Sequence, residues 1–321
     1  MRRSTWLRGA RLALSIVVLG FIAWALRAQW TAYRAHPLET QVSVAWLLAA
    51  AAVYLATYAV LIQTWRLMLR AWDAHLGFWR SAHIWTVSSL YRYVPGTLWQ
   101  VGAMGVMAER EGVSGFAAGG TAILSTIVNL AAGVTIALAT AWRAMDRLAP
   151  GGRPVALALA VAAAAGLALL PVAMPAVMRL ASRLTGRELP SVQVPPRVIG
   201  YAVVGNLIAW GMYGLAFQCL THGILGQSAG ALPDYIAVYT ASYVLGYVVL
   251  FLPAGLGAAD ASMAAALPAL GLMSAPQAAL VAVASRLLRT VLEVIPGFLF
   301  AAVDAVRRRG SSHPESNASS R

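Results

Sequence analysis

The chain has 321 residues, of which 60% are hydrophobic and 11% are charged. A soluble domain carries about 25% charged residues, so this composition excludes an ordinary soluble protein and predicts an all-α integral membrane protein. The formal net charge is +13. Every basic residue is an arginine, and many of the arginines stand in clusters that flank apolar runs, which predicts membrane topology and no nucleic-acid partner.

Seven apolar runs are long enough to cross a membrane, since a helical span needs about 20 residues. Two further apolar segments are interrupted by proline and glycine. Together they predict a polytopic helical bundle of about seven or eight spans, occupying residues 1–306. The expected spans are 10–28, 44–68, 117–141, 154–178, 199–222, 233–252 and 277–304, and the broken segments are 81–108 and 253–272.

Arginine-rich flanks predict which ends of the spans face the cytoplasm. The clusters precede the first span, follow the second, join the fourth to the fifth and follow the last, so both termini are expected inside. This assignment requires segment 81–108 to return to its own side of the membrane; a full crossing would place Arg179–Arg197 outside. Residues 307–321 are predicted to be a disordered basic cytoplasmic tail. The clustered arginines are Arg2, Arg3, Arg8, Arg11, Arg66, Arg70, Arg80, Arg179, Arg183, Arg187, Arg197, Arg307, Arg308 and Arg309.

The first broken segment contains "YRYVPGTLWQVG". Pro95 cannot donate a backbone hydrogen bond and Gly96 favours departure from a helix, so the stretch predicts the turn of a re-entrant hairpin. Arg92 and Gln100 would then lie near membrane depth on either side of the turn. The alternative is an amphipathic helix on the cytoplasmic surface.

The second broken segment, "LPAGLGAADASM", repeats this device with Pro253, Gly255 and Gly257, and Asp260 follows in an apolar run. A lone buried carboxyl is commonly a neutral structural group, but its place after a helix break makes a functional role a competing interpretation. Segments 44–141 and 233–304 share the order span, broken segment, span. Paired interruptions of this kind predict discontinuous helices around a central transport site and a possible internal repeat.

The last span carries Arg286, Arg289 and Glu293, spaced three and four residues apart. At this spacing they fall within about 60° of one another on one helix stripe. Charges at the centre of a membrane are tolerated where they face protein or a wet cavity. An internal salt bridge from Arg289 to Glu293 is one explanation, but it leaves Arg286 without a partner, so a polar cavity is favoured.

The sequence lacks the motifs that are typical of soluble enzymes and metal-binding domains. The five histidines do not occur at metal-ligand spacing, no glycine-rich phosphate loop is present, and Cys219 is the only cysteine. The sequence therefore predicts no metal site, no cofactor and no enzymatic activity of its own.

The stretches "YRYVPGTLWQVGAMGVMAEREGVS", "LPAGLGAADASM" and "SRLLRTVLEVIPG" resemble the transmembrane region of lysylphosphatidylglycerol synthases and related free-standing bacterial inner-membrane proteins. The resemblance covers about residues 44–304 and implies a membrane domain that flips a lipid, without the soluble aminoacyl-transferase domain of the full-length synthases. Ala254, Ala259 and the pair Ser125–Thr126 depart from the pattern of many relatives. The matching positions are Pro95, Gly96, Pro253, Gly255, Gly257 and Arg286.

These features together predict a lipid translocase or flippase in the bacterial inner membrane. Arg92, Arg286 and Arg289 would hold a headgroup phosphate through charge-assisted hydrogen bonds. Asp260 and Glu293 would balance those charges, or bind a basic headgroup or a coupling proton. The alternatives are an intramembrane lipid-modifying transferase with one of these acids as general base, and a non-catalytic partner of a separately encoded lipid-modifying enzyme. The sequence specifies no oligomeric state.

Overall fold

The computed structural model describes residues 41–70, 73–93, 98–141, 151–185, 196–248 and 257–311. Every regular element in these ranges is helical, which confirms the predicted all-α class. The expected span 10–28 lies outside the described residues. The elements are α2 (Val44–Leu69), α3 (Phe78–Ser89), the 3₁₀ turn η2 (Leu90–Tyr93), α4 (Leu98–Glu109), α5 (Gly115–Thr140), α7 (Arg153–Thr185), α8 (Pro196–Leu225), α9 (Leu232–Val248), α10 (Ala258–Ala269) and α11 (Ala275–Ser311).

Three of the described helices are long and apolar enough to cross a membrane: Val44–Leu69, Ala117–Thr140 and Val198–Leu225. They correspond to three of the expected spans. Helix α11 is also long, but it carries the charged stripe of the last expected span. It continues to Ser311, so residues 307–311 are helical instead of belonging to a disordered tail, and the rest of that tail lies outside the described residues.

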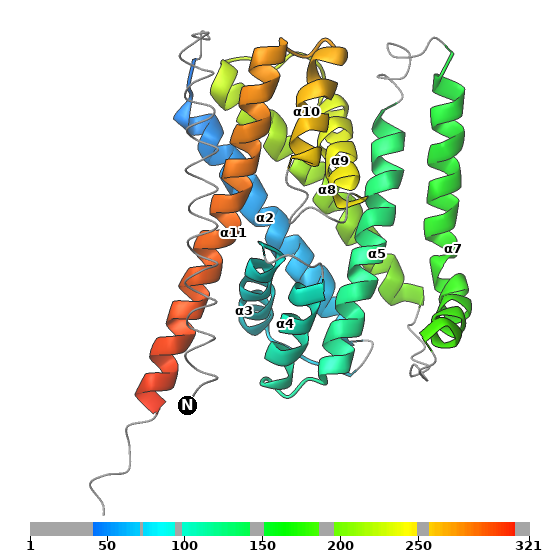
Figure 1. Cartoon of the computed structure of the whole chain (residues 1–321), viewed down its shortest axis with the longest axis vertical. Coiled ribbons are helices and arrows are strands. Elements are labelled where there is room, and N and C mark those ends of the chain that lie inside the picture. Colours follow the sequence, from blue (N-terminus) through cyan, green and yellow to red (C-terminus); the bar gives the residue numbers. More distant parts are fainter. Residues whose placement is uncertain are drawn as a thin grey trace, which may run out of the picture.

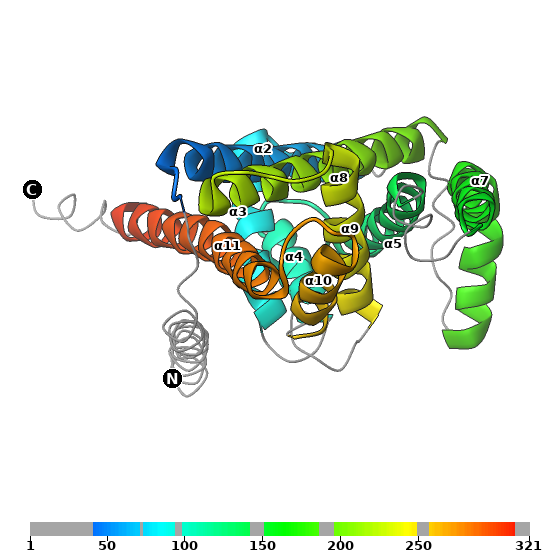
Figure 2. The same cartoon turned by 90° about the horizontal axis from the view of Figure 1, so that it is seen from above.

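Helices α2 and α8 run antiparallel and side by side (Figure 1), and they lie along one side of the bundle (Figure 2). Two glycines of α8 allow this close approach. A Cβ on Gly205 would overlap the side chain of Thr64, and a Cβ on Gly223 would overlap that of Leu47. Small residues at helix contacts are typical of membrane bundles, because van der Waals packing replaces the hydrophobic driving force there.

Helices α3 and α4 form a hairpin, which we call hairpin 1, in the lower half of Figure 1. Each has 12 residues, against 26 in α5. Hairpin 1 begins and ends at the end of the bundle where α2 terminates and α5 starts. Segment 81–108 therefore does not reach the opposite end of the molecule.

Helices α9 and α10 form a second hairpin, hairpin 2, which enters from the opposite, upper end (Figure 1). The expected span 233–252 is here the 17-residue helix α9, which ends at Val248 and packs against the 12-residue helix α10. The end of α9 and the start of α10 lie at mid-height, as do the end of η2 and the start of α4. The two hairpins thus point toward each other from opposite ends.

The order long helix, hairpin, long helix occurs twice, in α2–α5 and in α8–α11, with opposite orientations. Contacts between elements follow the same rule: α3 packs on α11 as α9 packs on α5, and α2 touches α5 as α8 touches α11. Helix α7 lies outside this scheme at the edge of the bundle (Figure 2), packed against α5 and α8. The second unit begins at α8, whereas the sequence comparison had placed its start at residue 233. The sequence comparison took residues 233–252 for a full span because they are apolar, but the described part of this segment lies in α9, the first arm of hairpin 2.

The turns that leave the two hairpins share one backbone geometry. Gly112 and Gly271 have φ values of 79° and 66°, a left-handed conformation that favours glycine at a helix C-terminus. The N–H of the following residue, Val113 or Leu272, donates to the carbonyl oxygen five positions earlier, at 3.0 Å in both turns. Both of these side chains are buried. The equivalence of the two units therefore extends to individual hydrogen bonds.

Candidate functional site

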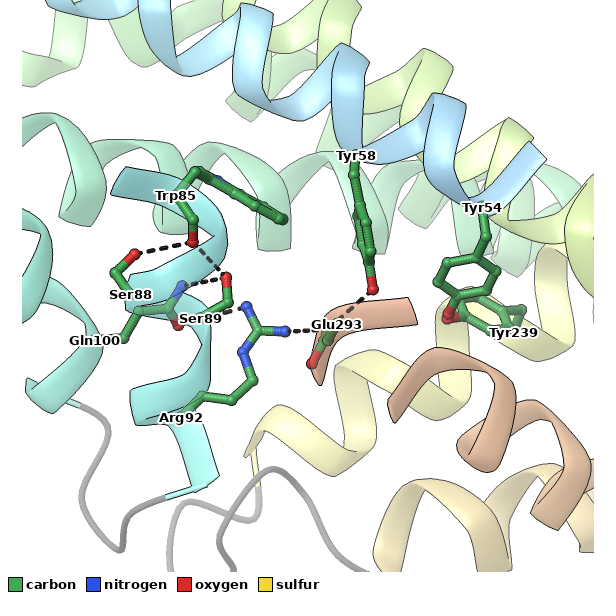
Figure 3. A network of polar contacts seen from close by, with 9 residues as sticks. All are labelled: Tyr54, Tyr58, Trp85, Ser88, Ser89, Arg92, Gln100, Tyr239 and Glu293. Atoms are coloured by element: carbon green, nitrogen blue, oxygen red, sulfur yellow. Dashed lines mark hydrogen bonds and ion pairs between the residues drawn. The ribbon is translucent and has the colours of Figure 1, made fainter. Parts of the chain in front are cut away.

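One polar contact between elements that are far apart in the sequence joins hairpin 1 to α11. Turn η2 places Arg92 so that its Nη1 donates to Oε1 of Glu293 at 2.8 Å (Figure 3). The Glu293 side chain is 3% exposed and that of Arg92 is 26% exposed. Tyr58 of α2 donates its hydroxyl to the same oxygen at 3.2 Å. One buried carboxylate is thus held by groups from two other elements.

Arg92 also connects the two arms of hairpin 1. Its Nη2 donates to Oε1 of Gln100 at 3.4 Å, and Nε2 of Gln100 donates to Oγ of Ser89 at 3.5 Å. The Ser89 hydroxyl donates in turn to the carbonyl oxygen of Trp85 at 2.8 Å. Arg92 and Gln100, which were predicted on either side of the turn, therefore lie in one hydrogen-bonded chain (Figure 3).

A second ion pair joins hairpin 2 to the same helix α11. Nε of Arg286 lies 2.6 Å from Oδ2 of Asp260, with side chains 6% and 25% exposed. Asp260 also accepts a hydrogen bond from the backbone N–H of Gly257 at 3.3 Å. Gly257 has φ 87°, a left-handed conformation suited to glycine at the start of α10. The expectation that Arg286 lacks a partner is wrong, because α10 brings Asp260 onto the charged stripe.

Arg289 lies between these two pairs along the stripe. Its guanidinium carbon is 5.8 Å from the ring centroid of Tyr243 on α9, within the range of a cation–π contact. Glu293 is held from hairpin 1 and α2, so an internal Arg289–Glu293 pair does not by itself describe the stripe. The polar centre comprises Arg92, Gln100, Asp260, Arg286, Arg289 and Glu293.

A cluster of buried and half-buried tyrosines borders the polar centre. The hydroxyls of Tyr54 and Tyr239 hydrogen-bond to each other, and the ring of Tyr213 stacks on that of Tyr239 with centroids 5.5 Å apart. The sequence interpretation did not include these residues. Their signal was present, because tyrosines spaced four apart share one helix face. They are Tyr54 and Tyr58 on α2, and Tyr235, Tyr239, Tyr243 and Tyr247 on α9.

Two of the backbone pairs expected to shape the site, Pro95 with Gly96 and Pro253 with Gly255, lie outside the described residues. Within the described part of the chain, no group of three or more His, Cys, Asp or Glu side chains is arranged to hold a metal ion. A cavity of about 170 Å³ lies elsewhere, between the end of α8 and the start of α11. Its lining includes Gln277, about four helical turns along α11 from Glu293.

The polar centre holds three arginines and two carboxylates, which leaves one positive charge. On insertion scales, each charged side chain at the centre of a membrane helix costs on the order of 2.5–3.5 kcal/mol. Such charges are therefore expected to be paired, and they commonly mark a substrate or ion path. Here both carboxylates pair with arginines from other helices, and the pairs connect α11 to each hairpin. The site can accept one further anion without acquiring a net negative charge.

The fold and this site define an α-helical integral membrane protein with a charged centre between two opposed hairpins. The family described as lysylphosphatidylglycerol synthase TM region matches residues 10–297. The chain therefore belongs to this lipid-related family of membrane proteins, as the sequence resemblance predicted. Comparison with curated proteins gave no significant match.

Proposed function

We propose that the protein is a lipid translocase that moves an anionic phospholipid or lipid-linked headgroup across the membrane. The observation that carries the proposal is a set of two ion pairs, Arg92–Glu293 and Arg286–Asp260, which join the two hairpins to α11 and each have one buried side chain. Ion pairs of this kind cost desolvation energy and seldom add stability compared with apolar packing. Their presence in a lipid-related family supports a path for a charged headgroup.

A translocase must offer the headgroup a polar route while the acyl chains remain in lipid. Arg92, Arg286 and Arg289 supply guanidinium groups that bind phosphate in a bidentate geometry. The excess of one positive charge in the polar centre suits a phosphodiester monoanion. Aromatic side chains of the tyrosine cluster line the apolar side of this route.

The hairpins are proposed to be re-entrant, with their turns near the middle of the bilayer. Two inverted units with discontinuous helices at their interface are the arrangement by which many transporters build a central site and alternate its access. The opposed directions of hairpin 1 and hairpin 2 support this assignment (Figure 1).

The lower end of Figure 1 is proposed to be cytoplasmic, in the inner membrane of a bacterium. At this end lie the C-terminal ends of α2, α7 and α11 and the start of α8. These are the segments whose sequences carry the arginine clusters, and the positive-inside rule places them in the cytoplasm. Segment 179–197 keeps its cytoplasmic assignment because hairpin 1 returns to this end.

No catalytic role is proposed for the two carboxylates. A general base must be positioned toward the substrate proton that it abstracts. Asp260 and Glu293 are instead positioned toward arginines, at 2.6 and 2.8 Å. This pairing supports transport over the alternative of an intramembrane transferase.

The experiment is reconstitution of the purified protein into vesicles that contain fluorescent phosphatidylglycerol. An impermeant reductant bleaches the outer leaflet, and translocation lets it bleach more than the outer half of the label. We expect a protein-dependent increase that is lost in Arg286→Gln and retained in Arg110→Gln, which changes an exposed arginine in the turn after hairpin 1. Bleaching that stops at the outer leaflet with folded wild-type protein would overturn the proposal.

A further inference from the structure

Arg92 has a place in the proposed path, yet in the structure its Nη1 is bound to Glu293. A headgroup phosphate that binds Arg92 at this position must compete with a carboxylate whose side chain is 3% exposed. An ionised carboxylate in such a site is stabilised by an opposite charge, and it takes up a proton more readily when that charge is engaged elsewhere. Binding of the anion and protonation of Glu293 are therefore linked.

We propose that the phosphate of an anionic lipid displaces Glu293 from Arg92 and that Glu293 then takes up one proton, so that lipid movement is coupled to proton movement. This inference rests on the proposed translocase function and adds its coupling ion. The Arg92–Glu293 pair is neutral before binding. After binding, a guanidinium, a phosphodiester monoanion and a neutral carboxylic acid again sum to zero.

The proton balance is simple. The carboxylate of Glu293 accepts one proton from water on the side that delivers the lipid, while the Arg92 guanidinium keeps its proton throughout. When the lipid leaves toward the other leaflet, Glu293 releases the proton and re-forms its bond with Arg92. A lipid anion and a proton cross together, so the transported unit carries no net charge through the low-dielectric interior.

The groups around Glu293 support its assignment as the acid that takes up the proton when the lipid binds. Several charged and titratable groups approach Glu293 from the elements packed around α11. His83 of α3 is not among them, because its ring lies against Phe300, about two helical turns beyond Glu293 on α11. The groups that interact with Glu293 or share its stripe are Arg92, Tyr58, Tyr213, Tyr239, Arg286 and Arg289. Tyrosine hydroxyls stay protonated at neutral pH in model peptides, with pKa near 10.

Asp260 is less suited to this role, although it also pairs with an arginine. Its side chain is 25% exposed, and it accepts a hydrogen bond from the Gly257 N–H in the first turn of α10. Asp260 therefore keeps a backbone donor when an anion engages Arg286. Glu293 is the more buried acid, and its two donors, Arg92 and Tyr58, are side chains of other elements, so we assign the proton to Glu293.

The test titrates purified protein in detergent with short-chain phosphatidylglycerol in weak buffer at neutral pH, and a pH-indicator dye reports protons. We expect about one proton taken up per lipid bound by wild type, and binding without uptake in Glu293→Gln. Glu111→Gln is the matched control, since it changes a half-buried acid outside the polar centre, which pairs with the exposed Arg80, and it should keep the uptake. Phosphatidylcholine, which has no net charge, tests whether the signal follows the anion.

A second measurement uses only the wild type, in case Glu293→Gln does not fold. Between about pH 7 and 9 the affinity for phosphatidylglycerol should weaken about tenfold per pH unit, because one proton is bound with each lipid. Lipid binding without proton uptake and with a flat pH profile would overturn the coupling and leave the translocase proposal standing. Uptake that persists in folded Glu293→Gln would also overturn it. No binding of phosphatidylglycerol to folded wild type would overturn both proposals.

Discussion

Arg92 and Glu293 are separated by 201 positions in the chain, and their side chains meet at 2.8 Å. This bond attaches the turn of hairpin 1 to the middle of α11. Arg286 attaches hairpin 2 to the same helix through Asp260. Helix α11 is thus the element on which both hairpins converge, and a movement of either hairpin must break or exchange an ion pair.

Variants of the Arg92–Glu293 pair can distinguish a role in stability from a role in transport. Arg92→Gln leaves a buried carboxylate without its guanidinium partner, so we expect the free energy of unfolding to fall by about 3 kcal/mol, and the double variant Arg92→Gln/Glu293→Gln to recover most of this loss. Translocation should be lost in both. Thermal melting in detergent and vesicle translocation measure the two effects.

Arg80→Gln, which changes the exposed arginine of the ion pair with Glu111, is the control and should change stability by less than about 1 kcal/mol. Translocation that recovers together with stability in the double variant would show that the pair only holds the bundle together.

Arg286 provides a second test of the headgroup path. Replacing Asp260 by Asn keeps an oxygen that can accept from the Gly257 N–H but removes the negative charge opposite Arg286. We expect Asp260→Asn to insert and fold, and to bind phosphatidylglycerol more tightly, because the Asp260 carboxylate no longer competes with the lipid phosphate for Arg286. Fluorescence binding in detergent checks this, with Arg286→Gln as the matched loss of the cation. Weaker binding in folded Asp260→Asn would argue that the carboxylate contacts the lipid itself.

Packing between α8 and α9 predicts a pair of opposite results on one helix. A Cβ on Gly214 would overlap the backbone and side chain of Ile236, whereas a Cβ on Gly211 meets nothing within 4 Å. Gly214→Ala should therefore destabilise the protein by about 1–3 kcal/mol. Gly211→Ala should be neutral or stabilising by up to about 1 kcal/mol, since alanine is the better helix former. Melting temperatures of the two variants decide the point, and equal values would contradict the described contact between α8 and α9.

The inverted arrangement predicts that the ends at which the chain leaves the two hairpins face opposite sides of the membrane. In a Cys219→Ala background, Arg110→Cys lies in the turn after hairpin 1 and Ala275→Cys at the start of α11, and both positions are exposed. An impermeant maleimide added to intact cells should label Ala275→Cys and leave Arg110→Cys unlabelled until the membrane is permeabilised. Labelling of both sites from outside would exclude opposed re-entrant hairpins.

Hydropathy and local spacing were sufficient to predict the helical membrane class. The reason is that crossing a bilayer requires long apolar helices, and each helix satisfies its own backbone hydrogen bonds without help from distant residues. The apolar spans in α2, α5 and α8 and the charged stripe of α11 each follow from residues within one segment. The family, too, was indicated by short local motifs, and residues 10–297 match it.

Contacts between side chains that are far apart in the sequence could not be predicted from hydropathy and local spacing. The sequence interpretation left Arg286 without a partner, and the tertiary structure supplied Asp260 from α10. It also brought Arg92 to Glu293 and gathered tyrosines from α2, α8 and α9, because close packing at glycines of α8 decides which helix faces meet. The start of the second unit at α8 was likewise decided by packing. Hydropathy measures how well a segment tolerates lipid, whereas pairing depends on the crossing and register of helices that are far apart in sequence.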